Sequence, residues 1–539
     1  MVSLSPAHAR RFVSIPLGAR PMSLRLWVLS SAAALGSGLL ISLGYPGYPG
    51  GSLAWVCLVP WLLALRGHSL AGRLWLGLLC SVVSNLLIKM MPFYGAALTI
   101  SPNVPVAMLS NALILISYMF PYILFSALHG RFESITLRDS LILASWLTLG
   151  MVLTPVLFTF SPATFLYRQP VFLQVLEFSG FSLLLWVIVL VNLLVRNLLL
   201  MAWQRWIRGE TGAPWRLHAG VLVLTVGLVV GHGYWRLADA DTASAGTLRV
   251  ATVQANLGGR LTQMALLRDG PQRPGYSYVE LTRAALEEAG PVDLVIWPEN
   301  GITVECDHPA LARRLSTFVA DIATPLMYQC TACEATAGGE GERCHNQSRY
   351  MDATGTARFR YNKQHLIPFF EWLPDATWAT LVAPHLQNEL LFQKGESSQL
   401  FHHGQTAIIP AICYDAHDMA LLRRGTALGG ELLAVQSNNR IFGLTKIGLS
   451  DLAINIISSA SLGLPMVKVS NAGYGGVVDG YGRILPDSIS PLYERHFDVY
   501  DLPLVGRETL FRRYGDWFAW VVAVVAIGGL VIQEKRARR

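Results

Sequence analysis

The sequence predicts a polytopic α-helical membrane domain that carries an α/β domain built on layered sheets. Of the 539 residues, 52% are hydrophobic and only 14% are charged, whereas about a quarter of a soluble protein's residues are charged. Long apolar runs fill the chain before residue 240, and short strand-like runs follow them. Much of the surface must therefore face lipid, while the later segment has the pattern of a water-exposed domain.

About eight runs approach the 20 or so mostly apolar residues that a membrane-spanning helix needs. They lie near residues 24–45, 52–66, 73–93, 104–128, 139–160, 171–201, 215–236 and 516–533. The run 52–66 is short for a span. The expected organisation is a basic leader (1–23), a membrane domain of about seven helices (24–236), a polar domain (237–515), a C-terminal span (516–533) and a basic tail (534–539).

The distribution of basic residues predicts the orientation of these spans. The leader, the tail and alternate loops are basic, and the intervening loops contain one arginine between them. Because cytoplasmic loops are enriched in Lys and Arg, both termini are expected in the cytoplasm and residues 237–515 outside it. The membrane part with its tails has 19 basic and 5 acidic residues, against 23 and 30 in residues 237–516. The net charge of +7 therefore reflects topology and gives no reason to expect a nucleic-acid partner.

The external segment alternates short β-branched runs with helical stretches, which favours an α/β sheet. Expected strands are 248–254, 294–297, 326–328, 406–412, 432–436, 466–469 and 476–478, and expected helices are 262–289 and 310–322. The stretch 376–399 is apolar without a regular period and is expected to form a loop that dips toward the bilayer.

Cys413 follows the apolar run 406–412 and precedes Tyr-Asp-Ala-His. A nucleophile at a strand-to-helix turn is held accessible, with backbone N–H groups nearby that stabilise an oxyanion. A free thiol, with a pKa of about 8.5, stays largely protonated near neutral pH, so a nucleophilic cysteine needs a base. The alternative, which this residue alone does not exclude, is an inert buried cysteine.

Glu299 and Lys363 are candidate partners of that thiol. Glu299 follows a predicted strand and the pair Trp297-Pro298, surroundings that can raise the pKa of a carboxylate and suit it to act as a base. Lys363 can place an ammonium where a tetrahedral intermediate develops negative charge. Glu371, eight residues further on, can orient Lys363 or act as a second carboxylate. Taken singly, each also fits a helix cap or a solvated surface charge.

The chain has seven cysteines. Cys57 and Cys80 fall in predicted spans, where Cys usually behaves as a small apolar residue. Four others cluster in the external segment: Cys306, Cys330, Cys333 and Cys344. Outside the cytoplasm such a set can form disulfides. Structural thiols or a metal site are the alternatives, although no second ligand pair at a fixed spacing follows.

Two histidines have a simpler interpretation, and one lysine is expected to have no catalytic role. We expect His365 and His417 to make local hydrogen bonds and not to bind a metal. Lys89 lies near the outer end of the third span, where a long cationic side chain commonly extends to the membrane interface.

The motifs around the three candidate residues occur in a diagnostic order. Ile-Trp-Pro-Glu299, Tyr-x-Lys363-x-His-Leu-x-Pro-Phe-x-Glu371 and Ile-Cys413-Tyr-Asp resemble the nitrilase superfamily, whose Glu-Lys-Cys triad corresponds to Glu299, Lys363 and Cys413. Residues 253–256 and 476–483 resemble that family's opening segment and closing hairpin. With spans on both sides of the domain, the whole chain resembles the apolipoprotein N-acyltransferase family within that superfamily.

The resemblance implies a nitrilase-type α-β-β-α sandwich in the periplasm, on a multi-pass base in the bacterial inner membrane. It implies that Glu299 takes the thiol proton, that Cys413 attacks a phospholipid ester, typically of phosphatidylethanolamine, and that Lys363 stabilises the oxyanion. The amine of a diacylglyceryl-cysteine apolipoprotein then resolves the thioester. Glu371, Tyr414 and Asp415 match supporting or substrate-binding positions, with Asp415 where the family usually has Glu. No cofactor or metal is implied.

This chain departs from the family in the region expected to surround the substrate. The family reads Ser-Asn-Asp-x-Trp-Phe-Gly where residues 437–443 read Ser-Asn-Asn-Arg-Ile-Phe-Gly. The family's next helix carries His and Arg, and residues 449–464 contain neither. A Trp expected after the opening strand is missing from residues 258–275. These departures leave the triad intact and bear on the identity of the acceptor.

Three functions therefore stay open. The first is N-acylation of apolipoproteins, or a paralogous acyl transfer to a different amine. The second is a membrane-tethered amidase or nitrilase-type hydrolase, in which water resolves the acyl-enzyme. The third is a non-enzymatic transporter or assembly factor. The third is disfavoured because only Lys89, Glu177 and Arg196 are ionisable residues in or near the spans, whereas a transporter usually needs more polar groups at mid-bilayer.

Overall fold

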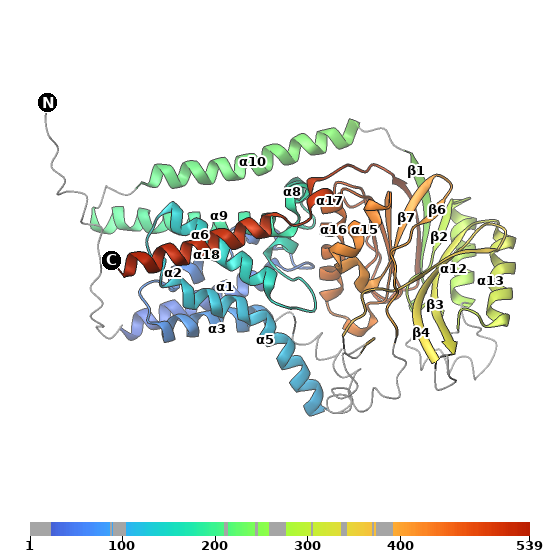
Figure 1. Cartoon of the computed structure of the whole chain (residues 1–539), viewed down its shortest axis with the longest axis horizontal. Coiled ribbons are helices and arrows are strands. Elements are labelled where there is room, and N and C mark those ends of the chain that lie inside the picture. The colour runs from blue at the N-terminus through green and yellow to red at the C-terminus, as the bar shows by residue number, and fades with distance from the viewer. Residues whose placement is uncertain are drawn as a thin grey trace.

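The computed structural model joins a helical bundle to a layered α/β unit (Figure 1). It describes residues 23–86, 89, 104–209, 214–242, 246–257, 276–302, 305–335, 342–368, 371–372 and 392–538. All but the last residue of the expected leader, and most of the expected loop 376–399, lie outside these ranges.

The bundle consists of long apolar helices that run side by side (Figure 1). They are α1 (Leu24–Gly44), α3 (Leu70–Leu86), α5 (Val104–His129), α6 (Leu137–Leu153), α9 (Phe181–Arg208), α10 (Trp215–Thr242) and α18 (Phe518–Ala537). Within the described residues, five helices are long and apolar enough to cross a membrane: Leu24–Gly44, Asn111–His129, Phe181–Ile207, Trp215–Thr242 and Phe518–Arg536. The chain's apolar first half and its C-terminal segment therefore form one membrane-type domain.

Two expected spans are broken in the structure. The run 52–66 forms the 3-10 helix η2 (Gly51–Trp55) and the six-residue helix α2 (Val59–Ala64), which is too short to cross a bilayer. The run 171–201 begins as two short helices, α7 (Pro170–Leu173) and α8 (Leu176–Ser179), before α9 starts. Gly180 makes that break with φ of 68°, and a Cβ there would lie 2.5 Å from the Phe511 ring.

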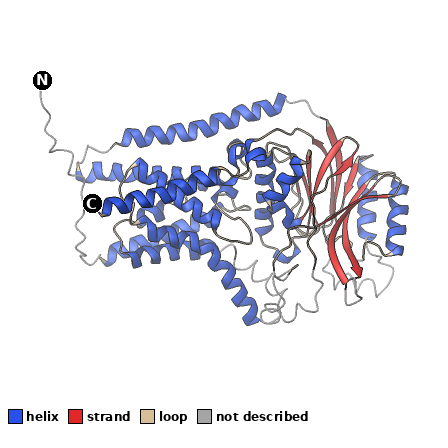
Figure 2. Ribbon diagram, in the orientation of Figure 1, coloured by secondary structure: helices blue, strands red, loops and turns tan. Residues whose placement is uncertain are grey.

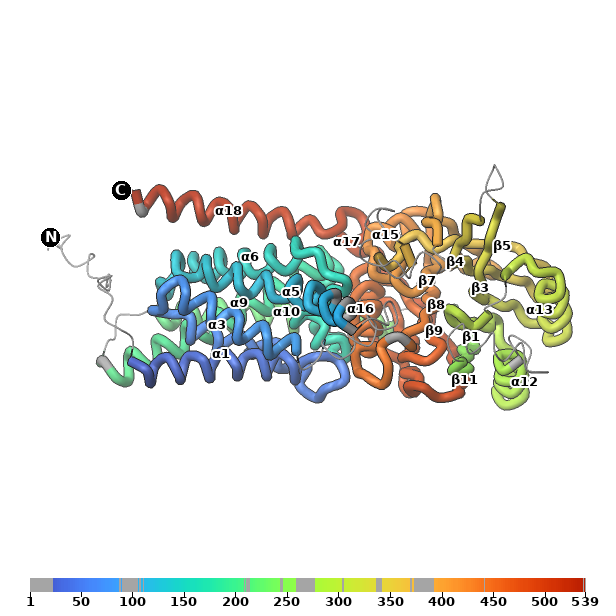
Figure 3. The backbone as a smooth tube through the Cα atoms, turned by 90° about the horizontal axis from the view of Figure 1, so that it is seen from below, coloured from blue at the N-terminus to red at the C-terminus, as the bar shows by residue number. Residues whose placement is uncertain are grey.

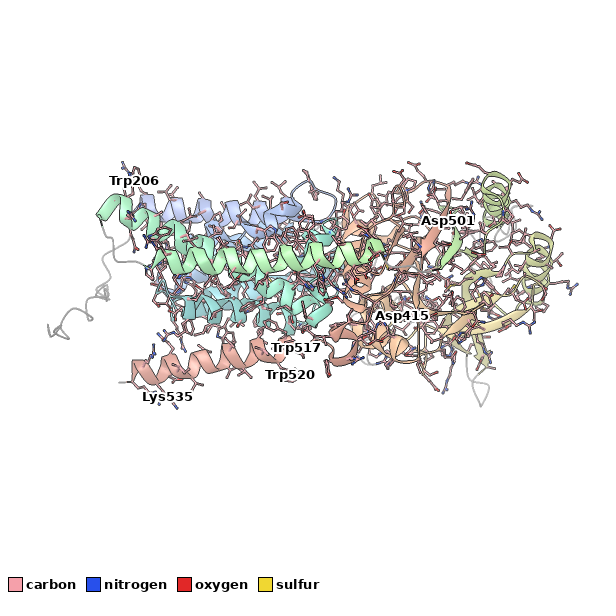
Figure 4. All side chains as sticks on the ribbon, turned by 90° about the horizontal axis from the view of Figure 1, so that it is seen from above. Trp206, Asp415, Asp501, Trp517, Trp520 and Lys535 are labelled. Carbon is pink, nitrogen blue, oxygen red and sulfur yellow. A yellow bond between two sulfur atoms is a disulfide. The ribbon has the colours of Figure 1, made fainter. Side chains whose placement is uncertain are left out.

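The last helix packs onto the bundle although it is far away in sequence. Helix α18 lies beside α6 (Figure 3), where Val522 and Ala526 pack on Leu149. Trp517 and Trp520 lie at the end of α18 near the α/β unit, and Lys535 lies at the far end (Figure 4). Aromatic and basic residues at opposite ends of an apolar helix are typical of a membrane span.

The α/β unit contains two sheets that face each other (Figure 2). The six-stranded sheet has the order β11-β1-β2-β3-β4-β5 and the five-stranded sheet β10-β9-β8-β7-β6. The strands are β1 (Thr247–Gln254), β2 (Leu294–Ile296), β3 (Leu326–Ala335), β4 (Glu342–Met351), β5 (Ala357–Asn362), β6 (Phe401–His403), β7 (Thr406–Ile412), β8 (Leu432–Ser437), β9 (Met466–Ser470), β10 (Gly476–Val478) and β11 (His496–Pro503).

Helices cover both outer faces, so the expected α-β-β-α sandwich is confirmed. Helices α12 (Tyr276–Ala289) and α13 (Pro309–Ile322) lie on the six-stranded sheet, and α15 (Met419–Ala427) and α16 (Ile447–Leu462) lie on the other (Figure 1). Every residue of α16 is buried, because this helix lies between a sheet and the membrane bundle. The helix is mainly apolar, as a doubly covered helix usually is, and its charged residue Asp451 bonds to neighbouring side chains.

All seven expected strands are present, but β4, β5, β6 and β11 were missed. Strand β4 reads Glu-Arg-Cys-His-Asn-Gln-Ser-Arg-Tyr-Met, a polar run without the β-branched residues that mark a strand. Its central polar side chains, Asn346, Gln347 and Ser348, are buried, and Asn346 belongs to the site described below; hydrophobic patterning does not detect such a strand. Of the expected helix 262–289, the part from residue 276 is confirmed as α12.

The four external cysteines form two disulfides, Cys306–Cys330 and Cys333–Cys344. The second joins residues that already face each other across strands β3 and β4. Among the described residues, Cys333, Glu342 and Cys344 lie close enough together to bind a metal ion. The disulfide between the two cysteines removes the thiolates that such a site would need. The disulfide alternative is therefore the one the structure adopts.

The expectation for Lys89 was wrong. Its side chain is buried, with only 3% exposed, and its Nζ donates to Asn85 Oδ1 at 2.7 Å. The ammonium lies 4.0 Å from the centre of the Tyr118 ring. Aromatic faces attract a cation more strongly where water is excluded, which keeps this lysine inside the bundle.

Candidate active site

Each of the three triad candidates follows a strand. Glu299 lies just beyond β2, Lys363 directly follows β5, and Cys413 directly follows β7. Strands β2 and β5 belong to the six-stranded sheet and β7 to the five-stranded sheet. The sandwich therefore brings together residues from both of its layers, which no local sequence pattern encodes.

Lys363 is fixed between two carboxylates. Its Nζ lies 3.2 Å from Glu299 Oε1 and 2.7 Å from Glu371 Oε1. The other oxygen of Glu371 accepts the Ile367 N–H at 2.9 Å. Lys363 is 1% exposed and Glu299 is 4% exposed, so neither charge is solvated and each depends on the other.

Asn346, in β4, is a site residue that the sequence analysis missed. Its amide nitrogen donates to Glu299 Oε1 at 2.8 Å and lies 3.4 Å from Glu371 Oε1. Its amide oxygen accepts from Gln329 Nε2 at 2.7 Å. The signal that could have identified Asn346 is the run Asn346-Gln347-Ser348. Three amide and hydroxyl side chains in a row suggest a polar site once β4 is recognised as a strand.

Cys413 has a strained backbone with φ of 49°, in the left-handed region that is costly for a residue with a Cβ. Such strain is typical of nucleophiles that are held at a sharp strand-to-helix turn. Burial and the nearby Glu299 carboxylate raise the pKa of the thiol well above its usual value, although Lys363 opposes the shift. The resting side chain is therefore a thiol, and a nucleophilic role requires that it lose its proton.

The electrostatics of the two partners suit that requirement. Burial raises the pKa of Glu299, with Lys363 opposing the shift. Burial by itself would lower the pKa of Lys363, but Glu299 and Glu371 outweigh it and raise that pKa well above normal. The arrangement thus joins a permanent cation, a carboxylate of increased basicity and a protonated thiol, which is what general-base nucleophilic catalysis needs.

Residues 249–486 match the family model described as carbon-nitrogen hydrolase. The chain carries a carbon-nitrogen hydrolase domain. Curated proteins named apolipoprotein N-acyltransferase are similar to the chain as a whole. The one from Geobacter metallireducens is 24% identical over 68% of this chain and 69% of its own length. Those from Gloeobacter violaceus and Thermotoga maritima are each 25% identical, over 94% of both chains and 93% of both chains respectively.

Among solved structures, a variant of the amidase from Nesterenkonia sp. AN1 aligns with 48% of this chain and 93% of its own. The two are 17% identical, with a TM-score of 0.34.

Asp415 ties two loops of the hydrolase domain together. Its buried carboxylate accepts the backbone N–H of His365 at 2.7 Å and that of Ile412 at 3.0 Å. It also accepts the Tyr361 hydroxyl at 2.9 Å. The loop after Lys363 is thereby fixed to the turn that bears Cys413, so this Asp is long enough to make the link despite being shorter than the family's Glu. Burial raises the pKa of Asp415 to about 6.

Tyr414 connects the hydrolase domain to the membrane bundle. Its hydroxyl donates to the Leu157 carbonyl, in the segment after α6. Its ring meets the Phe158 ring edge-on at 5.6 Å. The residue next to Cys413 therefore contacts the membrane domain, which places Cys413 at the junction of the two domains.

The region that departs from the family contains a buried Asp–His pair of its own. Asp451 of α16 accepts from His417 Nε2 at 2.6 Å and from Asn439 Nδ2 at 2.7 Å, and it pairs with the buried Lys468 of β9. The loop lacks an acid at Asn439 and the helix lacks a histidine. The structure supplies an acid from that helix, Asp451, and an imidazole from the turn of Cys413, His417.

Proposed function

We propose that the protein transfers a fatty acyl chain from a phospholipid to the N-terminal amine of diacylglyceryl-cysteine in apolipoproteins, through a thioester on Cys413. The observation that carries the proposal is the buried Lys363, held between Glu299 and Glu371, beside a strained cysteine that rests on the membrane domain through Tyr414. Similarity to the named N-acyltransferases over nearly the whole chain supports this acceptor.

In the first half-reaction, Glu299 takes the proton of the Cys413 thiol as its sulfur attacks the phospholipid ester carbonyl. Lys363 stabilises the negative charge that develops on the carbonyl oxygen. When the C–O bond breaks, Glu299 returns the proton to the leaving alkoxide, and lysophospholipid departs. The acyl chain remains on sulfur as a thioester. Glu371 keeps the Lys363 ammonium oriented.

In the second half-reaction, the acceptor amine attacks the thioester carbonyl. A C–N bond forms, the C–S bond breaks, and Glu299 transfers a proton from nitrogen to the leaving sulfur. Splitting the transfer in this way predicts ping-pong kinetics. No step in this scheme uses a cofactor. Phosphatidylethanolamine is the proposed donor.

The proposed location is the bacterial inner membrane, with both termini cytoplasmic and the hydrolase domain periplasmic. Charge asymmetry between loops supports this orientation. The two disulfides of the hydrolase domain also support it, because disulfides persist in the periplasm and rarely in the cytoplasm. The contact between Tyr414 and Leu157 supports a position of the cysteine near the membrane, where a phospholipid can reach it.

The decisive experiment is intact-protein mass spectrometry after incubation with phosphatidylethanolamine. We expect a hydroxylamine-labile fatty-acyl adduct on the parent protein and none on Cys413→Ala. Cys57→Ala and Cys80→Ala are matched controls, since these are the other free cysteines among the described residues and both are buried. Both controls should keep the adduct.

The absence of an adduct on the parent, with phospholipid demonstrably bound, contradicts the proposal. Adding a diacylglyceryl-cysteinyl peptide then tests the acceptor. Loss of the adduct together with N-acylation of the peptide is the expected result. Release of free fatty acid with the peptide unmodified identifies a hydrolase instead.

A further inference from the structure

The second half-reaction of the proposed function has a proton requirement that Glu299 alone does not meet. A free α-amino group has a pKa of about 7.7–8.0, so near neutral pH the acceptor arrives mainly as an ammonium ion. That nitrogen must lose one proton to become a nucleophile and a second as the amide forms. Glu299 transfers one proton in each half-reaction. The other proton must pass either to water, since part of the amine is already neutral near pH 7, or to a second base at the site.

His417 has the geometry of such a base. It lies in the same 3-10 helix as the nucleophile, η5 (Cys413–His417), and its side chain is 6% exposed. The Asp451 carboxylate carries a negative charge, because the effect of Lys468 outweighs burial and lowers its pKa. A carboxylate can only accept, so His417 Nε2 must be the donor in their bond.

The other nitrogen of that ring is free. In a neutral imidazole with its hydrogen on Nε2, Nδ1 carries a lone pair. Nδ1 of His417 is buried and has no hydrogen-bond partner. A buried polar atom without a partner calls for an explanation, and a catalytic role is one of those that apply. An imidazole fixed by a carboxylate on one side, with its other nitrogen unoccupied, is the arrangement that hydrolases use for proton acceptance.

Two aromatic rings at the junction of the two domains surround the imidazole. The His417 ring lies 5.3 Å from that of Tyr414 and 5.2 Å from that of Phe158. The charged and titratable groups that face it or its partner are Asp451 of α16, Lys468 of β9, Tyr414 and Asp418 beside it, and His365 across the Tyr414 ring.

We propose that His417, oriented by Asp451, takes the first proton from the acceptor's α-ammonium, an inference that rests on the proposed function. The N–H bond breaks and the proton binds Nδ1, giving an imidazolium beside Asp451. The freed lone pair forms the C–N bond with the thioester carbonyl. The C–S bond breaks, and the second proton passes through Glu299 to the Cys413 sulfur. The imidazolium then releases its proton to water.

His417→Gln tests this directly, since its side-chain amide still donates to Asp451 but provides no basic nitrogen. The acyl-enzyme is first formed with phosphatidylethanolamine, and a diacylglyceryl-cysteinyl peptide is then added. We expect acylation of Cys413 within about threefold of the parent and transfer at pH 7 slower by about tenfold or more. His308→Gln is the matched control, because it replaces an exposed histidine at the start of α13, outside the site, and should leave both steps unchanged.

Two rescue measurements separate proton transfer from a structural role. Near pH 9 the α-amine is mostly neutral, so the deficit of the variant should shrink to within about threefold. Hydroxylamine, which is neutral at pH 7, should discharge the parent and variant acyl-enzymes at equal rates. His417→Asn keeps an amide donor for Asp451 and gives the same expectations, so it serves if the Gln variant does not fold.

Equal transfer rates at pH 7 overturn the proposal. So does a deficit that persists near pH 9 and with hydroxylamine, because that pattern means that His417 only supports the turn. A parent that forms no adduct on Cys413 overturns the proposed function itself and is recognised before any variant is compared.

Discussion

Asn346 donates a hydrogen bond from its side-chain amide to the carboxylate of Glu299, with Nδ2 and Oε1 2.8 Å apart. The bond favours the ionised carboxylate and lowers the pKa of Glu299, which burial otherwise raises. A residue from a strand that the sequence did not reveal thus adjusts the proposed base.

Removing this amide should shift the pH dependence of acylation. In Asn346→Ala, the pKa of Glu299 rises further, so a higher pH is needed to ionise the base. We expect the acidic limb of the acylation rate to move to higher pH, with the rate at pH 7 reduced by about tenfold. Rapid-quench mass spectrometry of the acyl-enzyme across pH measures this. An unshifted limb would show that Asn346 does not act on the base.

Asp415 should make stability depend on pH in an unusual direction. Its pKa rises from 3.8 to about 6 on folding, so the folded protein holds the proton more tightly than the unfolded chain. The stability that the Asp415 proton contributes to the folded protein is therefore fully present below 3.8, the pKa in the unfolded chain. It is lost as the pH rises through about 6. A shift of this size corresponds to about 3 kcal/mol.

The variant Asp415→Asn lacks this titration. Relative to the variant, the unfolding free energy of the parent should fall by about 2 kcal/mol between pH 4 and pH 7, which is most of the full effect. Thermal unfolding in detergent at several pH values provides the comparison. Parallel profiles for the two proteins would contradict the assignment.

Tyr414→Phe removes the hydroxyl that donates to the Leu157 carbonyl. The ring and its contact with Phe158 remain, so the variant isolates one hydrogen bond between the domains. We expect a loss of about 1 kcal/mol in stability and acylation slowed by a few-fold, because the Cys413 turn loses its support on the membrane domain. Thermal unfolding and adduct formation measure the two effects. No change in either would mean that the bond does not position the turn.

The two disulfides should differ in importance. Cys306–Cys330 closes a loop with a sequence separation of 24, and replacing both residues with Ser should cost about 3 kcal/mol of unfolding free energy. Cys333 and Cys344 are already held opposite each other by the β3–β4 ladder, so their replacement should cost less. Denaturant unfolding of the two double-Ser variants tests the order, and the reverse order would refute this explanation.

The sequence by itself determined the class of fold and named the three triad candidates. Long apolar runs require lipid, and alternating strands and helices require a layered sheet, because both patterns follow from local periodicity. Glu299, Lys363 and Cys413 were identified because each lies in a short contiguous motif. Such motifs are preserved in the linear order of residues, whatever the rest of the chain does.

Only the tertiary structure decided how these residues are supported. Asn346 lies in a strand whose polar residues hide its character, and Asp451 reaches His417 from a helix 34 residues away in sequence. A buried hydrogen bond requires two side chains whose separation depends on the packing of whole layers, and periodicity carries no information about that distance. The partners of Lys89 and the pairing of the four external cysteines depend on the same packing of layers, so the tertiary structure decided them as well.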